Sequence, residues 1–205
     1  MAVIQSGTGT DLLGVGAVSK AARVTPYDSL GNDRGTKATY RAATASTVAA
    51  AASTQPFFII QGSATKTIIV QRITISGASL TAVAYAAYQA RKFSTAISGG
   101  TPVTLTQTPV DANSAAATAN LCQVYTAAPT QGTLVGTIEE QRVLLQATTA
   151  AAAGIPDIVV FDFRTTGSEN TGVYLRGTSQ GLGIGFGAAP GSAVTLSVMV
   201  EWTEE

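Results

Sequence analysis

Histidine is absent from these 205 residues, and this narrows the chemistry that their side chains can perform. Nucleophilic catalysis by a Ser-His or Cys-His pair needs an imidazole as the general base, and imidazole is also the commonest metal ligand in proteins. Cys122 is the single cysteine, so an internal disulfide and a cysteine-based zinc site are both excluded. Because Cys122 lies in a segment that is predicted to form a strand, we expect a buried, inert thiol.

Paired carboxylates are the remaining route to acid–base catalysis, and the sequence offers two candidate pairs. Glu139 and Glu140 are adjacent, so in a strand their side chains point to opposite faces. Asp157 and Asp162 are five residues apart, which also places them on opposite faces of a regular strand. Neither pair is expected to flank one substrate. We therefore predict that the protein is not an enzyme and has no catalytic residues.

A glycine-rich segment at 181–188 (GLGIGFGA) loosely matches the pattern with which dinucleotide-binding folds hold a pyrophosphate. That pattern requires a helix immediately afterwards, whereas residues 189–192 (APGS) are typical of a turn. We interpret the segment as a strand kept thin by glycine, against which another backbone packs closely. No cofactor is predicted.

Oxygen ligands for calcium are present at Asn32–Asp33 and at Asp111–Asn113. Neither cluster has the spaced ligands of a calcium-binding loop, so Asx turns are the expected structures and no metal site is predicted. Trp202 lies in the apolar register of the last strand, which favours a place in the core over a platform for carbohydrate.

The segment at 193–202 gives the clearest secondary-structure signal, because apolar and polar residues alternate with a period of two. Runs rich in β-branched and aromatic residues, bounded by glycine and proline, predict further strands. No helix alternates with them, so we predict an all-β, antiparallel β-sandwich that resembles a jelly roll; an immunoglobulin-like sandwich stays open. The predicted strands are 57–60, 67–75, 82–93, 118–126, 133–147, 155–164, 173–186 and 193–202.

Residues 1–55 differ in composition and periodicity from the rest of the chain. They contain Gly, Thr and Asp without a sustained period, followed by a run of Ala, Thr and Ser at 42–53. Such a segment rarely holds a shape alone. We predict an extended N-terminal arm over 1–55, containing a short strand or two, and a β-sandwich domain over 56–205.

Charged residues make up only 12% of the chain, about half of the usual share of roughly 25%. A surface with so few charges repels other chains weakly and favours association with them. The two halves of the chain have net charges of opposite sign. Residues 1–100 hold nine basic and three acidic residues, whereas residues 101–205 hold three basic and nine acidic residues. Complementary faces between subunits would explain this asymmetry, and so would mixing of both halves in one sandwich.

The sequence gives no sign of other partner classes. No dense basic tract indicates nucleic acid, and no apolar run reaches the length that crosses a bilayer. The first residues lack the features of a secretory signal, so we expect synthesis in a cytoplasm.

Three stretches resemble small virion proteins of tailed bacteriophages, particularly the head-decoration or cement proteins. They are residues 19–32 (SKAARVTPYDSLGN), residues 57–77 and the segment from 91 to 111, with AAPT at 127–130 beyond it. The resemblance implies a capsid cement role on the surface of a virion made in a host cytoplasm. It also implies the major capsid protein or other virion subunits as partners and a homo-oligomer, with a trimer favoured. It carries over no functional residues.

Two alternatives remain open at this stage. A tail, neck or fibre component would share the same composition. A carbohydrate-binding module for host attachment would belong to another functional class and would need exposed aromatic side chains.

Overall fold

The computed structural model describes residues 37–46, 48–50, 53–80, 84–147, 157–164, 172–191 and 193–205. The chain divides into two compact units, Met1–Lys37 and Ala38–Glu205. Residues 1–36 of the predicted arm lie outside the described residues, and this part includes the Asn32–Asp33 cluster. The described strands all belong to the second unit.

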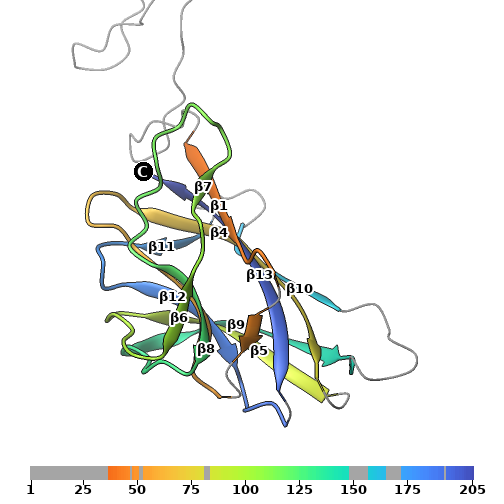
Figure 1. The fold of residues 1–205 in the computed structure, drawn as a ribbon. Coiled ribbons are helices and arrows are strands. Elements are labelled where there is room, and N and C mark those ends of the chain that lie inside the picture. Colours follow the sequence, from red (N-terminus) through yellow and green to blue (C-terminus); the bar gives the residue numbers. More distant parts are fainter. Residues whose placement is uncertain are drawn as a thin grey trace, which may run out of the picture. The chain divides into compact units, whose positions relative to one another are not determined.

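The described residues form strands and no helices, in two antiparallel sheets that pack against each other (Figure 1). The first, called sheet I below, has the order β10-β4-β13-β1-β7, with β11 beside β4 and β2 beside β13. Its strands are β1 (Ala38–Ala43), β2 (Val48–Ala50), β4 (Ile68–Ser79), β7 (Thr108–Pro109), β10 (Ile158–Asp162), β11 (Val173–Leu175) and β13 (Val194–Glu204).

The other sheet, called sheet II below, has the order β6-β8-β3-β12-β5-β9. Its strands are β3 (Pro56–Gln61), β5 (Ala84–Phe93), β6 (Thr101–Thr104), β8 (Cys122–Ala127), β9 (Leu134–Leu145) and β12 (Gly181–Phe186). The predicted antiparallel β-sandwich is therefore confirmed.

The strand pairing is that of a jelly roll. The first strands along the chain, β1 and β2, pair with the last, β13; β3 pairs with β12, β4 with β10 and β11, and β5 with β9. Strands from the two ends of the chain pair with each other, and pairing continues inward, so the chain folds like one long hairpin. When this hairpin rolls up, β13 lies beside β4 and β12 lies beside β5. The pairing thus decides between the jelly roll and the immunoglobulin-like sandwich.

An excursion between β5 and β9 carries three further strands. β8 and β6 extend sheet II beyond β3, while β7 pairs with β1 in sheet I. The excursion therefore lies along the same side of both sheets.

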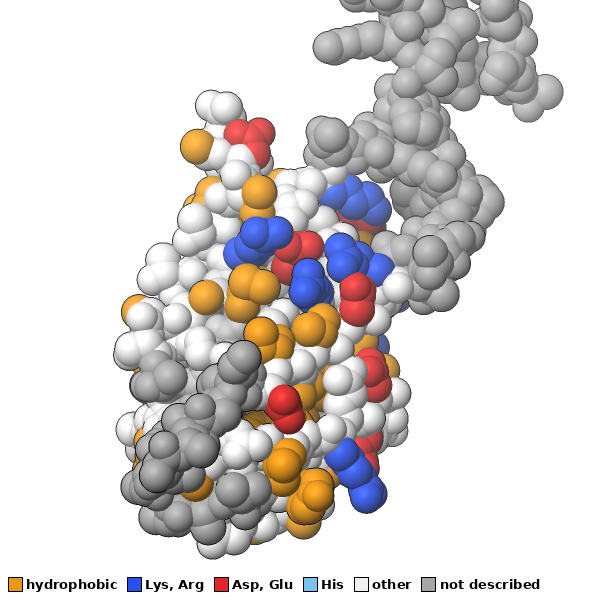
Figure 2. Space-filling model, turned by 90° about the vertical axis from the view of Figure 1, so that its right-hand side faces the viewer, with side chains coloured by type: hydrophobic (Ala, Val, Ile, Leu, Met, Phe, Trp, Pro, Cys, Tyr) orange, Lys and Arg blue, Asp and Glu red, His pale blue; other side chains and the backbone are white. Residues whose placement is uncertain are grey.

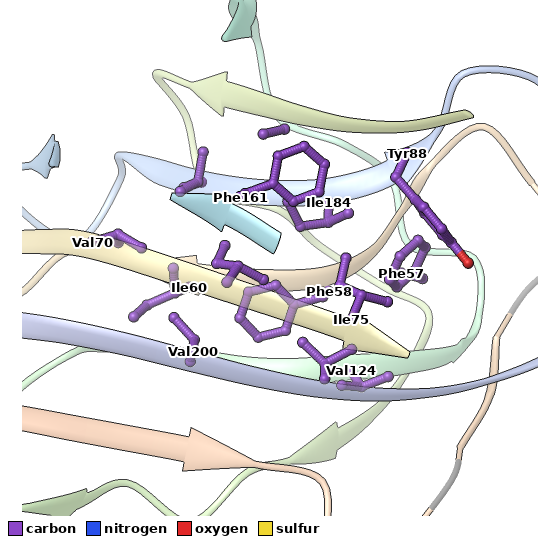
Figure 3. Packing of buried hydrophobic residues seen from close by; sticks show 14 of the residues in the cluster. Phe57, Phe58, Ile60, Val70, Ile75, Tyr88, Val124, Phe161, Ile184 and Val200 are labelled. Atoms are coloured by element: carbon purple, nitrogen blue, oxygen red, sulfur yellow. The ribbon is translucent and has the colours of Figure 1, made fainter. Parts of the chain in front are cut away.

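The core fills the space between the sheets. On β13, Val194, Leu196, Val198, Val200 and Trp202 are fully buried, as the alternation predicted. Figure 3 shows Phe58 and Ile60 of sheet II in one cluster with Ile75 and Val200 of sheet I. A smaller cluster of Ile59, Phe93, Ile97 and Tyr125 covers part of the other face of sheet II, and for this reason β3 is buried throughout.

Two predicted divisions of the chain differ from the structure, and β6 and β7 lie where no strand was predicted. The sandwich begins at Ala38, inside the segment 1–55 that was assigned to the arm, because β1 and β2 are its first strands. Tyr40 and Ala42 point into the core there, but alanine gives too small a hydrophobic contrast for the alternation to stand out. The single strand predicted at 173–186 is two, β11 and β12, separated by a turn in which Gly177 has a φ of 67°.

Candidate interaction surface

Of the two candidate carboxylate pairs, Glu139 and Glu140 lie within one strand, whereas Asp157 precedes β10 and Asp162 ends it. In β9, Glu139 is opposite Ala90 and Glu140 is opposite Gln89, so their side chains lie on opposite faces. The Glu140 carboxylate accepts hydrogen bonds from the Gln89 amide (2.6 Å) and from Arg142 (3.2 Å). These bonds, that of Gln89 first, lower the pKa of Glu140.

Asp162 is bound by a cation and not by a second carboxylate. Arg164 donates to both of its carboxylate oxygens, at 2.8 and 2.6 Å. This side-chain bond is the main reason why the pKa of Asp162 falls from 3.8 to about 2. Asp162 is therefore held ionised, which is unsuited to a general acid.

The glycine-rich segment is a strand, as predicted. β12 is buried on both faces, with Leu182, Ile184 and Phe186 in the core. On its other face, a Cβ atom added to Gly183 would lie 3.0 Å from Phe93 and 3.2 Å from the Phe58 carbonyl oxygen. Close packing of neighbouring groups therefore favours glycine at this position.

Three further side chains are placed as the sequence predicted. Cys122 is fully buried, and its burial raises the pKa of the thiol to about 12. Trp202 lies in the core, stacked on Tyr40 with ring centroids 5.8 Å apart. Asp111 forms an Asx turn, because its carboxylate accepts the Asn113 backbone N–H at 2.9 Å.

Across the described residues, no three His, Cys, Asp or Glu side chains lie close enough to hold a metal ion. The same part of the chain contains no helix that is long and apolar enough to cross a membrane.

A row of alternating charges crosses the outer face of sheet I. Arg41, Glu201, Arg72 and Asp162 are directly opposite one another on β1, β13, β4 and β10, and Arg41 binds Glu201 at 2.6 Å. Figure 2 shows basic and acidic side chains gathered together on that side of the molecule. The row joins basic residues of the first half of the chain to acidic residues of the second. It therefore supports mixing of the charges in one sandwich as the explanation of the asymmetry.

Most edge strands among the described residues are short. β6 has four residues, β7 two, β10 five, and β2 and β11 three each. Pro102 lies in β6 and Pro109 in β7. Short edges that contain proline resist pairing with other chains.

β9 is different, because it is an edge strand of twelve residues whose one partner among the described strands is β5. Its register with β5 shifts twice, and these shifts leave Val135 and Ile138 opposite no residue of β5. Such bulges turn side chains in a new direction. Leu134, Val135 and Ile138 are 48%, 63% and 45% exposed, and these three residues are called the apolar strip below.

The apolar strip and the edge position of β9 form a candidate interaction surface that the sequence did not reveal. The strand was expected at 133–147, but nothing in its residues indicated that it would lie at the edge of a sheet. The signal present was the uncharged run LVGTI at 134–138, in which apolar residues do not alternate regularly.

Exposed aromatic surface is small. Tyr85, which is 84% exposed, is the one aromatic side chain above one third exposure in the part of the chain that the structure describes. Carbohydrate platforms rely on such rings, so this surface offers a glycan little to stack on.

Comparisons with protein-family models, with curated proteins and with solved structures found no match to this chain.

Proposed function

We propose that this protein is a virion structural subunit of the decoration, or cement, type, which binds across shell subunits and stabilises the head. The observation that carries the proposal is the apolar strip in the first half of β9, presented by a jelly-roll domain. Jelly rolls occur in viral capsid proteins, although the fold alone does not determine a function.

Physical reasoning connects the surface to an assembled state. A long edge strand with outward-facing apolar side chains favours association in a free monomer. A charged fraction of 12% does little to oppose it. In a particle, neighbouring subunits would cover the same surface. Binding only the assembled shell would stabilise that shell by mass action.

The proposed partners are the major capsid protein or other virion subunits, and the site of action is the capsid surface. The homo-oligomer, and the trimer favoured among its forms, stay predictions. Residues 1–37 are proposed to add contacts to the shell beyond those of the sandwich.

Copy number in purified particles tests the proposal first. Quantitative mass spectrometry with labelled peptides should find this protein in numbers comparable to those of the major capsid protein. A few copies per particle would instead place it in the tail, neck or fibre. Its absence from particles would refute a virion role.

Shell binding in solution tests the surface. Purified protein added to shells that lack it should bind and raise the temperature at which the shells open. Val135→Asp in the apolar strip should weaken binding, because it puts a charge into a contact between apolar groups. Ile158→Asp is the matched control, since Ile158 is 65% exposed on β10 in the other sheet. Equal effects of the two variants would contradict a role for the strip.

Deleting residues 1–37 tests the arm separately. All described strands lie in Ala38–Glu205, so the shortened protein should keep its β-sheet circular dichroism spectrum. It should bind shells more weakly. Unchanged binding would show that the arm is dispensable.

A further inference from the structure

The second half of β9 is a regular strand, and its second edge pairs with no other strand among the described residues. From Glu139 to Leu145 the residues pair with β5 in one unbroken register. The two bulges lie before this segment, at Val135 and Ile138. Bulges and charges are devices that keep an edge from pairing indiscriminately. The bulges leave seven residues free of irregularity, so the charges decide which pairings are allowed.

One two-fold register of β9 brings opposite charges together, whereas other registers bring like charges together or leave the charges without a charged partner. In a two-fold antiparallel pair, one residue faces its own copy, and the residues on either side face each other in reverse order. A centre at Glu139 or Glu140 puts glutamate opposite glutamate, and a centre at Arg142 puts arginine opposite arginine. Like charges placed directly opposite are destabilising.

A centre at Gln141 gives the reverse result. Glu140 then faces Arg142 of the second copy, and Arg142 faces Glu140 of the second copy, so two ion pairs form at once. The regular pairing then covers residues 139–143 of each copy. We infer that this protein forms a two-fold dimer in which the β9 strands of two copies pair antiparallel about Gln141, joining their sheets II into one continuous sheet.

The side chains that the dimer uses are accessible in the single chain. The Arg142 side chain is 82% exposed and that of Glu140 is 35% exposed, and they form an ion pair on the outer face of sheet II. Gln141 points to the other face, where its amide donates to the Val160 carbonyl oxygen at 2.7 Å. The dimer therefore adds partners to the Glu140–Arg142 pair without taking Gln141 from its present contact.

Sedimentation velocity of the full-length protein over a range of concentrations is the direct test. The protein should form a dimer. Glu140→Arg and Arg142→Glu should each raise the dimer dissociation constant by at least about tenfold, because like charges then face each other twice. Mixing the two variants should restore dimers, because every charge then faces its opposite. Neither change of fold nor loss of the internal ion pair explains restoration on mixing.

Disulfide trapping tests the register. At the centre of the pair, Cα atoms are about 4.5 or 5.5 Å apart, within the range of roughly 4.4–6.8 Å that a disulfide spans. Gln141→Cys should therefore give covalent dimers under mild oxidation. Glu139→Cys is the control, since its copy would lie about 13 Å away along the strand. The native Cys122 is buried and should not react.

Three results would overturn the inference. They are a monomer at every soluble concentration, an oligomer that neither charge variant changes, and equal trapping at positions 139 and 141. All of these measurements use the free protein, so they are independent of the virion role. A dimer that fails to bind shells would refute the proposed function alone.

Discussion

Replacing Glu204 tests whether a buried carboxylate fastens the excursion between β5 and β9 to the sandwich. The Glu204 side chain is fully buried near the end of β13. It accepts hydrogen bonds from the Trp202 indole N–H (3.1 Å), the Thr118 backbone N–H (2.8 Å) and the Thr118 hydroxyl (2.8 Å). The Lys66 ammonium group lies 3.5 Å from the same carboxylate.

Glu204→Ala should destabilise the protein substantially. Removing one partner from a buried charged network costs about 3–5 kcal/mol, and hydrogen bonds to a charged group contribute about 1.5–3 kcal/mol each. The Lys66 side chain is 35% exposed, so water can reach part of the site and the lower end applies. We expect a loss of about 3 kcal/mol in the free energy of unfolding, or a fall in Tm of roughly 6–12 °C for a domain of this size.

Urea unfolding followed by Trp202 fluorescence and circular dichroism measures this change. Glu204→Gln should lose less, because one oxygen is retained as an acceptor. Asp157→Ala is the matched control, because Asp157 is exposed just before β10, and should shift stability by less than about 0.5 kcal/mol. If Glu204→Ala costs no more than Asp157→Ala, the carboxylate does not fasten the excursion.

Two further predictions concern ionisable groups. Arg164 holds the pKa of Asp162 at about 2. This folded-state pKa is below the unfolded value of 3.8, so the ion pair stabilises the fold above pH 3.8. The contribution is lost as the pH falls towards 2. The Asp162 side chain is 42% exposed, so solvent screening should keep the contribution below about 1 kcal/mol. Arg164→Gln should move the carboxyl titration seen by NMR towards 3.8, and an unchanged titration would disprove the pairing. Burial raises the pKa of Cys122 to about 12, so a thiol reagent at pH 8 should label it only after unfolding, and rapid labelling of the native protein would contradict its burial.

Strand formation was largely predictable from the sequence. The alternation at 193–202 depends only on neighbouring residues, since a period of two puts every second side chain on one face. The glycine-rich segment at 181–188 could likewise be assigned to a strand, because the turn that follows it excludes a phosphate-binding helix. The buried state of Cys122 followed from the apolar stretch around it.

β6 and β7 were not predicted, and β1 and β2 were expected only as a short strand or two within the arm, because the local signal of these strands was weak. β1 and β2 are rich in alanine, whose small side chain separates buried from exposed positions poorly. They form because β13 is available to pair with them, and this is a property of the whole fold. The division between β11 and β12 likewise arises because consecutive segments join different sheets.

The sequence by itself determined most of the strands, their apolar faces and the lack of an imidazole or a second thiol for catalysis. Only the tertiary structure decided the jelly-roll pairing, the row of charges across sheet I and the position of β9 at an edge. The physical reason is that a strand's own residues specify its two faces, whereas its neighbours depend on pairings between residues far apart in the chain. The proposed functions of the β9 edge therefore depend on topology, and its charges acquire their meaning only once that edge is open.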